Sequence, residues 1–531
     1  MVEYINNSGF QQFSAAKDAE KKSKYGPILV WVIIAILAGY LISNWMAPKQ
    51  LTVNNEQLTE VVQQVDAISN VPATAVGGDK IDATVRGIRL SGIVLKDFAD
   101  EKSEGGTVLL LGKDDNTEFA EIGILANGTT APGVGTVWKL HSEKDAGAPI
   151  TMTWRNADGV EFARKISVEN YIITVRDEVV NNTRRDFSVA PYARIVRHAG
   201  GNATTVATGG IARANGDIER ETWKSIGKKS YVWTTPAGFA GFADQYWETI
   251  LNIDSGDQTI KLKPLSDGRL QAETAAAAVS VPAGKTVTLT AHIFAGPKSP
   301  DILAAADAAI PGINQTIDYG WFWFLARPFL WAINALHGIV GNYGVAIIIF
   351  TILIRILMWP LTKKSFTGMA AMQKMQPEMQ RIQKTYANDK IRMQQEMMAL
   401  YKRTGSSPMS GCLPMILQIP IFFALYKALL ISVPMRSANF LWITDLAAMD
   451  PYFILPVLMG ATMWVQQKMQ SSAATATGDN PAAQMQKMMK YLPLIFTAMF
   501  AWMPAGLVLY WTVSNMFGLG QTWWIKRSAA K

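Results

Sequence analysis

Near the C-terminus, 35 consecutive residues (491–525) contain no charged side chain, and residues 25–48 form a second uncharged stretch. An α-helix rises about 1.5 Å per residue, so either stretch reaches across a hydrocarbon core about 30 Å thick. A polypeptide with such segments has to place them in lipid or in an unusually large apolar core. We therefore predict a multi-domain membrane protein.

The first uncharged stretch predicts an uncleaved transmembrane anchor over residues 25–47. Its apolar run is long for a signal peptide, and LISNWMAPKQ offers no small-x-small cleavage site. Four lysines lie between positions 17 and 24. By the positive-inside rule, these lysines place residues 1–24 in the cytoplasm.

Residues 50–310 have a different composition, rich in Thr, Val, Gly, Asp and Asn. Short runs of alternating apolar and polar residues are separated by turn signals. We therefore predict a periplasmic β-sandwich domain. In KTVTLTAHIF, one face carries Val287, Leu289, Ala291 and Ile293. Further strands are predicted at 135–142, 150–156 and 171–177, with turns at Asn127-Gly128, Asp158-Gly159, Asn215-Gly216 and Asp267-Gly268. The mean hydropathy of +0.11 fits this polar domain averaged with apolar spans.

The C-terminal region predicts an α-helical transmembrane core of five helices. An aromatic-rich helix at 319–342 is expected to lie in the membrane interface, where Trp and Tyr are favoured. The five predicted spans are 343–361, 411–433, 452–468, 489–503 and 506–525. They are joined by a cytoplasmic helical hairpin (362–410), a periplasmic loop (434–451) and a cytoplasmic loop (469–488), and a short cytoplasmic tail (526–531) follows them.

The distribution of charge supports this topology. The formal net charge is 50 − 42 = +8, and residues 362–403 alone hold nine Lys or Arg against three acidic residues. The predicted outer loop 434–451 has one Arg and two Asp. Both termini are therefore predicted to be cytoplasmic.

Motifs for catalysis or metal binding do not survive inspection, so we expect no enzyme activity, cofactor or metal. The single cysteine, Cys412, excludes an intrachain disulfide and multi-cysteine metal sites. The four histidines are far apart in sequence. Gly284-Lys285-Thr286 lacks the upstream glycine of a phosphate-binding loop.

Arg355 is the lone charge in the span 343–361, and an arginine near the bilayer centre costs about 2.5–3.5 kcal/mol even on insertion scales. Thr351 and Trp359 share its helix face. Arg355 could extend to the cytoplasmic interface or pair with a buried acid. The other five spans contain no Asp or Glu, which favours a water-filled cavity facing Arg355.

Polar residues in other spans are candidates to line the same cavity, although ordinary interhelical hydrogen bonding would explain each one singly. They are Gln418, Thr497, Tyr510, Trp511, Ser514 and Asn515.

The hairpin 362–410 reads as two amphipathic helices with methionine stripes. One stripe contains Met369, Met372, Met375 and Met379, and the second helix contains Met397. The two stripes either pack on each other or offer an adaptable surface to hydrophobic partners. The basic charge of this segment suits anionic headgroups or ribosomal RNA.

Residues 319–527 closely resemble the YidC/Oxa family of membrane protein insertases, and the upstream anchor and β-domain match the layout of its Gram-negative members. The resemblance rests on blocks that include ILIRILMWPLTKKS (352–365), MQPEMQRIQ (375–383), GCLPMILQIPIFFALYKAL (411–429), DPYFILPVLMGATM (450–463) and PAGLVLYWTVSN (504–515).

The resemblance implies a hydrophilic groove open to the cytoplasm and to lipid, in which the arginine matching Arg355 attracts a polar or acidic substrate tail. The hydrophobic part of the substrate would then slide into the bilayer along 412–433 and 491–503. Implied partners are nascent membrane proteins, lipid, the Sec translocon with its accessory subunits, which would touch a supersandwich-like β-domain, and the ribosome. The implied location is the bacterial inner membrane.

Two departures from the family pattern limit this transfer. The tail after the last span is short, which argues against ribosome docking through it, and Trp511 stands where many relatives have tyrosine. The alternative function is a small-solute transporter or channel that uses Arg355 as a substrate site, but no inverted repeat supports it.

Overall fold

The computed structural model describes residues 71–100, 106–112, 117–141, 148–199, 208–387, 389–404, 413–470 and 481–529. These residues fall into two compact units. The β unit contains the described residues up to Asp318 together with Leu430–Val433, and the helical unit contains the rest from Tyr319 onward. The predicted anchor at 25–47 and Cys412 lie outside the described residues.

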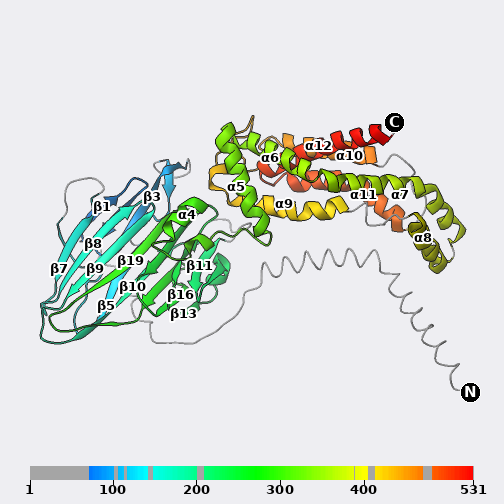
Figure 1. Cartoon of the computed structure of the whole chain (residues 1–531). Coiled ribbons are helices and arrows are strands. Elements are labelled where there is room, and N and C mark those ends of the chain that lie inside the picture. The colour runs from blue at the N-terminus through cyan, green and yellow to red at the C-terminus, as the bar shows by residue number, and fades with distance from the viewer. Residues whose placement is uncertain are drawn as a thin grey trace, which may run out of the picture. The chain divides into compact units, whose positions relative to one another are not determined.

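Two antiparallel sheets make up the β unit (Figure 1). The first has the main strand order β1-β2-β3-β5-β10-β17-β16-β13, and the second has the order β12-β11-β14-β15-β19-β9-β8-β7-β6. The strands of the first are β1 (Ala73–Gly77), β2 (Ile81–Arg86), β3 (Arg89–Ala99), β4 (Thr107–Leu109), β5 (Phe119–Asn127), β10 (Phe187–Arg197), β13 (Tyr231–Thr235), β16 (Gln258–Pro264), β17 (Leu270–Ala276) and β18 (Val279–Val281). Those of the second are β6 (Lys139–Leu140), β7 (Ile150–Arg155), β8 (Glu161–Glu169), β9 (Ile172–Val180), β11 (Gly209–Ala214), β12 (Asp217–Thr222), β14 (Phe239–Ala243), β15 (Trp247–Ile253) and β19 (Thr286–Pro297).

Turn chemistry and side-chain alternation explain this arrangement. Asn215 and Gly216 both have positive φ, 54° and 92°, as a two-residue hairpin turn between β11 and β12 requires. The strands predicted at 150–156 and 171–177 are confirmed as β7 and β9. The β-rich architecture predicted for this part of the chain is therefore confirmed.

The strand predicted at 135–142 is wrong over most of its length. Only Lys139–Leu140 pairs, with β7 at the edge of the second sheet. The preceding residues form a turn, in which the Thr136 amide donates to the Gly133 carbonyl at 3.1 Å. An edge strand has one neighbour, so a local turn competes successfully with pairing.

Arg164 forms a buried ion pair within the second sheet and a hydrogen bond to the first. The Arg164 side chain on β8 donates to both carboxylate oxygens of Asp177 on β9, each at 2.7 Å. Its Nη2 also donates to the carbonyl of Ile122 on β5 at 2.9 Å. Arg164 is 1% exposed, so Nε and Nη2 find these partners away from solvent. Apolar residues of both sheets, among them Phe162 and Val189, pack in the same cluster.

Three short helical segments complete the β unit, namely α3 (Trp223–Ile226), α4 (Pro300–Ala306) and η2 (Ile313–Gln315). The last one borders a buried polar cluster around Glu248 on β15, which is 1% exposed. Glu248 Oε1 accepts a hydrogen bond of 2.8 Å from the Thr316 hydroxyl, whereas Oε2 has no partner among the described residues. Burial raises the pKa of Glu248 to about 7, against the opposing charge of Lys298, and burial lowers the pKa of Lys298 to about 8.

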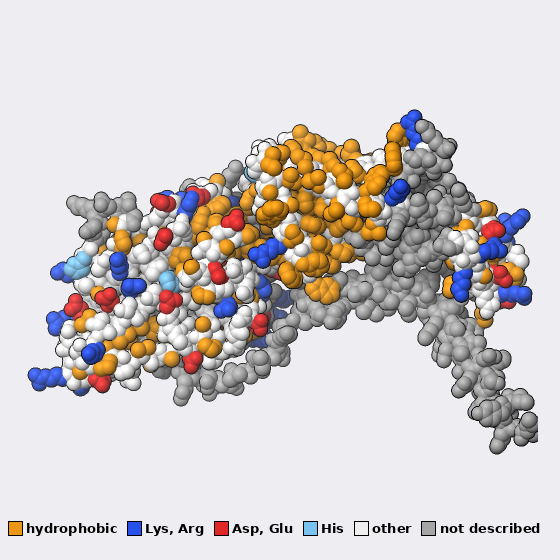
Figure 2. Space-filling view, in the orientation of Figure 1, with side chains coloured by type: hydrophobic (Ala, Val, Ile, Leu, Met, Phe, Trp, Pro, Cys, Tyr) orange, Lys and Arg blue, Asp and Glu red, His pale blue; other side chains and the backbone are white. Residues whose placement is uncertain are grey.

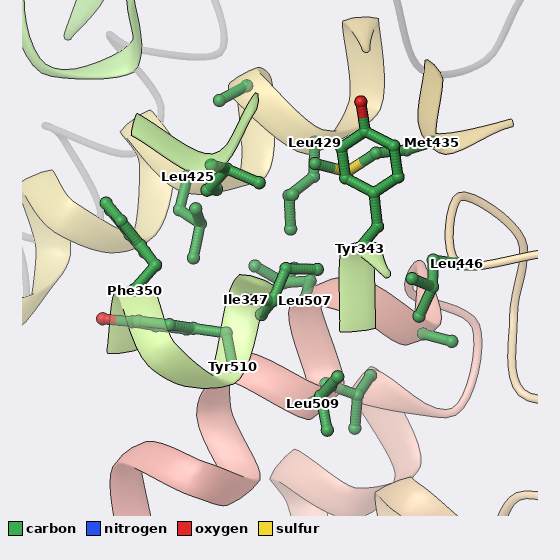
Figure 3. Close-up of a cluster of buried hydrophobic side chains, with 14 of the residues drawn as sticks. Tyr343, Ile347, Phe350, Leu425, Leu429, Met435, Leu446, Leu507, Leu509 and Tyr510 are labelled. Atoms are coloured by element: carbon green, nitrogen blue, oxygen red, sulfur yellow. The ribbon is translucent and has the colours of Figure 1, made fainter. Parts of the chain in front are cut away.

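The helical unit is formed by α5 (Trp323–Val340), α6 (Tyr343–Leu357), α7 (Trp359–Thr385), α8 (Lys390–Thr404), α9 (Leu413–Ile431), η4 (Val433–Met435), α10 (Ile454–Gln470), α11 (Pro481–Phe500) and α12 (Ala505–Ala529). The helical C-terminal region is thus confirmed. Its core contains Ile347 and Phe350 of α6 beside Leu507 and Tyr510 of α12, with Leu425 of α9 among the same buried side chains (Figure 3).

Proline positions set helix boundaries that differ from the predicted ones. The segment predicted at 343–361 ends as a helix at Leu357, and α7 begins at Trp359 rather than at 362. Pro360 has no amide hydrogen, so the helical hydrogen-bond ladder is interrupted there. The break between α11 and α12 agrees with the boundary predicted between 489–503 and 506–525, and α11 starts at Pro481, eight residues before the predicted 489.

Apolar side chains cover much of the visible surface of the helical unit, whereas charged side chains are scattered over the β unit (Figure 2). Exposed residues of the helical unit include Leu357 (72%), Leu494 (71%) and Trp502 (73%). Among the helices that the structure describes, none combines the length and the apolarity that a membrane crossing requires. The spans at 343–361, 411–433, 452–468, 489–503 and 506–525 stay predictions.

Replacing Arg164 alone should destabilise the β unit much more than replacing Arg164 and Asp177 together. Arg164→Leu leaves the Asp177 carboxylate buried without its partner, and we expect the β unit to lose roughly 3–5 kcal/mol of stability. The double variant Arg164→Met/Asp177→Leu should recover most of that loss. Hydrogen–deuterium exchange of the β8 and β9 amides measures both effects. Arg176→Leu, at an exposed position beside Asp177, is the matched control. Equal exchange in Arg164→Leu and the control would contradict the role of the pair.

Glu248 should make the stability of β15 depend on pH. The pKa of Glu248 in the folded protein is raised above the ordinary value of 4.5. The contribution of this carboxyl to the stability of the fold is therefore fully present below about pH 4.5 and is lost as the pH rises through about 7. Amide exchange in β15, corrected for its intrinsic rate, should therefore quicken between pH 5 and 7 in the wild type. Glu248→Gln should flatten this dependence, while Glu178→Gln, at an exposed position, should not. An unchanged slope in Glu248→Gln would rule the carboxyl out as its source.

Candidate functional site

Arg355 lies near the C-terminal end of α6, and its half-buried guanidinium reaches α12. Its Nε donates a hydrogen bond of 2.7 Å to the Ser514 hydroxyl, and Nη2 donates to the same oxygen. Ser514 is 1% exposed. Among the described residues, no carboxylate forms an ion pair with Arg355. The guanidinium is therefore held by a neutral hydroxyl.

Tyr510 extends the polar surface around Arg355. It lies one helical turn before Ser514 on α12 and is 1% exposed. Its hydroxyl accepts a hydrogen bond of 2.7 Å from the Gln418 side-chain amide on α9. The structure thus brings together Arg355, Ser514, Tyr510 and Gln418, which we call the Arg355 cluster, from three helices that are distant in sequence.

The other predicted groove residues make their hydrogen bonds and ring contacts outside this cluster. The Thr351 and Thr497 hydroxyls donate to carbonyls of their own helices, at 2.6 and 2.8 Å. The Asn515 amide faces α10, where Met459 O and Thr462 Oγ1 are 3.5 and 3.4 Å away.

Trp511 is placed in an aromatic group rather than among polar side chains. Its ring centroid lies 5.3 Å from that of Phe422, 5.9 Å from Phe496 and 5.2 Å from Phe500. These rings come from α9 and α11, so Trp511 joins three helices through apolar contact.

The methionines of the hairpin are only partly described. Met375 is 7% exposed, and Met379 and Met397 are partly exposed, whereas the side chains of Met369 and Met372 lie outside the described residues. One exposed ion pair joins the two helices, between Arg403 and Glu378 at 3.2 Å. Met398 and Ile391 of α8 stay exposed at 60% and 49%. Some apolar surface of α8 is therefore exposed.

The β unit holds a separate cavity of about 320 Å³ on the first sheet. Its Glu121 carboxylate is held by three side chains of the lining. The Glu121 carboxylate accepts from Arg89 at 2.9 Å, from Arg194 at 2.8 Å and from the Tyr192 hydroxyl at 2.8 Å. Burial raises the pKa of Tyr192 far above its usual range. Within the described residues, no cluster of His, Cys, Asp and Glu has the arrangement of a metal site.

One buried polar residue in the helical unit was missed by the sequence reasoning. Gln521 of α12 is 3% exposed, and neither its amide oxygen nor its amide nitrogen has a hydrogen-bond partner among the described residues. It lies seven residues after Ser514 and eleven residues after Tyr510, a spacing that places it on the same face of α12. That spacing was the available signal.

Comparison with known proteins covers both units. A model described as the YidC periplasmic domain matches residues 74–332, and one described as the 60Kd inner membrane protein matches residues 335–531. A Granulibacter bethesdensis protein named membrane protein insertase YidC is 35% identical over 488 residues, which cover 83% of each chain. A Rickettsia rickettsii protein of the same name is 33% identical over 521 residues, covering 90% of this chain and 91% of its own. A solved structure described as an active YidC insertase with the first transmembrane domain resolved covers 86% of this chain and 95% of its own, at 18% identity and a TM-score of 0.37.

The Arg355–Ser514 contact generates a prediction about stability. Ser514→Ala removes the acceptor of a charged donor, and we expect the helical unit to lose about 1.5–3 kcal/mol. Thr512→Val is the matched control, since Thr512 is equally buried but its hydroxyl bonds to the Val508 carbonyl of its own helix. Thermal unfolding of the purified protein in detergent, followed by tryptophan fluorescence, compares the two. Equal melting temperatures would mean that water replaces Ser514 without cost.

Proposed function

Because this chain belongs to the YidC family of membrane protein insertases, we propose that it inserts hydrophobic polypeptide segments into the inner membrane by way of the Arg355 cluster. The insertase function is supported by the names of its relatives, and the family is that of an inner-membrane protein with a periplasmic domain. The observation that carries the role of the cluster is the Arg355 cation, which is bonded to a neutral hydroxyl on an apolar helix.

The proposed topology has six membrane spans, with the β unit in the periplasm and both termini in the cytoplasm. Exposed apolar side chains of the helical unit support its contact with lipid, because a soluble protein rarely leaves so many large apolar groups in water. The excess of Lys and Arg in residues 362–403 supports a cytoplasmic hairpin.

The proposed mechanism uses the charge and the apolar surface in sequence. A polar or acidic tail of the substrate first approaches Arg355, because an unpaired cation on an apolar helix attracts negative charge strongly at low dielectric. The hydrophobic segment that follows then leaves water along α9 and α11, and its burial in lipid supplies the driving free energy. No step requires a nucleotide or a metal.

The proposed partners are nascent membrane proteins, the Sec translocon and the ribosome. The hairpin of α7 and α8 is the proposed receiving surface, since it combines exposed apolar residues such as Met398 with basic charge. Contact between the β unit and Sec accessory subunits rests on the family resemblance alone.

Removing the Arg355 charge tests the proposal. In vesicles that contain only the purified protein, Arg355→Ala should lower insertion of a substrate with an acidic translocated tail roughly tenfold, as expected for loss of a charged contact. Arg355→Lys should retain most insertion, because the positive charge remains. Protease protection of the translocated tail is the measurement.

Two comparisons make this experiment specific. Arg327→Ala removes an exposed charge from α5 and should insert the substrate like the wild type. A substrate with an uncharged tail should be much less sensitive to Arg355→Ala than the acidic one. Equal insertion of the acidic substrate by wild type and Arg355→Ala would eliminate the role of Arg355. Wild-type insertion no better than that of empty vesicles would eliminate the insertase function.

A further inference from the structure

Gln521 presents an amide group that the described protein does not satisfy. Its oxygen and its nitrogen are both buried without a hydrogen-bond partner, and the residue is 3% exposed. Most buried side-chain polar atoms in proteins are hydrogen-bonded. Leaving one unpaired costs about 1–3 kcal/mol, a cost that a leucine at this position would avoid. The amide therefore calls for a ligand outside the described residues.

The position of Gln521 relates it to the Arg355 cluster. It is seven residues after Ser514 on α12, so it lies about 10 Å farther along the helix axis on nearly the same face. Three residues beyond it, the Trp524 ring lies 5.3 Å from the ring of Trp359, which is one turn after Arg355 in sequence. Gln521 is thus flanked along α12 by the Arg355–Ser514 contact and by the Trp359–Trp524 contact.

The chemistry of an amide suits a peptide backbone better than a charged group. The Gln521 side chain offers one acceptor and one donor group, which complement the N–H and C=O that each non-proline residue carries. A polypeptide entering an apolar region must keep these backbone groups hydrogen-bonded. An amide recognises them whatever the sequence of the segment, whereas Arg355 distinguishes the charge of its side chains.

We propose that Gln521 is a substrate-contacting residue that hydrogen-bonds the backbone of the inserting polypeptide beside the Arg355 cluster, an inference that rests on the proposed function. Arg355 then selects for charge, and Gln521 supports any extended segment. The loss of insertion should consequently depend on the charge of the substrate tail when Arg355 is replaced, and should not depend on it when Gln521 is replaced.

Two substrates that differ only in the tail test this division. One has an acidic translocated tail, and the other has a tail of glycine, serine and asparagine. In vesicles containing the purified full-length protein, Gln521→Leu should lower insertion of both by the same factor, roughly two- to tenfold for one lost hydrogen-bonding group. Arg355→Ala should lower insertion of the acidic substrate far more than insertion of the uncharged one. Thr522→Val is the matched control, because Thr522 is also 3% exposed but donates to the Gly518 carbonyl.

A stability measurement separates this role from a structural one. If the amide serves the substrate, Gln521→Leu should melt at the same temperature as the wild type or higher, since an unpaired polar group is replaced by an apolar one. A fall in melting temperature that parallels the fall in insertion would overturn the inference. Unchanged insertion of both substrates by Gln521→Leu would also overturn it, and would leave water as the ligand of the amide.

Disulfide capture supplies a direct contact measurement. In a Cys412→Ser background, Gln521→Cys should form a disulfide with a cysteine in the substrate tail, while Met516→Cys, at a position that is 55% exposed, should not. Equal capture at both positions would contradict a specific contact. Wild-type insertion no better than that of empty vesicles would overturn the proposed function and this inference together, whereas an active wild type with an unaffected Gln521→Leu would overturn the inference alone.

Discussion

The hydrogen bonds from the Arg355 guanidinium to Ser514 bring a positive charge to a packed boundary between helices. A cation there is tolerated only where polar groups or water replace its hydration shell. The surrounding architecture follows from this requirement. α12 carries a serine where it faces Arg355 and a tyrosine one turn earlier, and α9 supplies Gln418 to that tyrosine. Apolar side chains such as Ile347 and Leu507 fill the rest of the helical core.

The arginines buried in the β unit and Arg355 of the helical unit have different kinds of partner. In the β unit, Arg164 is matched by Asp177, and Glu121 is matched by Arg89 and Arg194, so these cations end in carboxylates of the same unit. In the helical unit, Arg355 donates to the Ser514 hydroxyl, and the Gln521 amide has no hydrogen-bond partner among the described residues. An arginine paired with a carboxylate stabilises the fold. An arginine that has no carboxylate partner among the described residues can still attract the negative charge of another molecule.

Local sequence signals predicted what local chemistry determines. The Asn215-Gly216 hairpin turn was predictable because few residues adopt positive φ at two successive positions. Arg355 stood out because it is the lone charge in an apolar run. The strand at 135–142 failed because a turn at Gly133–Thr136 competes with a one-sided edge, a balance that alternation does not reveal. The Ser514 partner lies 159 residues from Arg355, and the burial of Gln521 depends on packing between helices. No short-range pattern reports the Arg355–Ser514 contact. Helical spacing places Gln521 on the face of Ser514 but does not reveal that its amide lacks a partner among the described residues.

The break at Met358 has a mechanical consequence. α6 and α7 are separated by this single residue, and the 27 residues of α7, with Pro377 inside the helix, span about 40 Å. A tilt of about 10° at the break would carry the far end of α7 about 7 Å, while Arg355, three residues before the break, would barely move. Trp359 is the first residue of α7 and contacts Trp524, so its ring lies close to the pivot. A small bend at Met358, one turn from Arg355, would therefore displace the far end of α7 and leave the charged site in place.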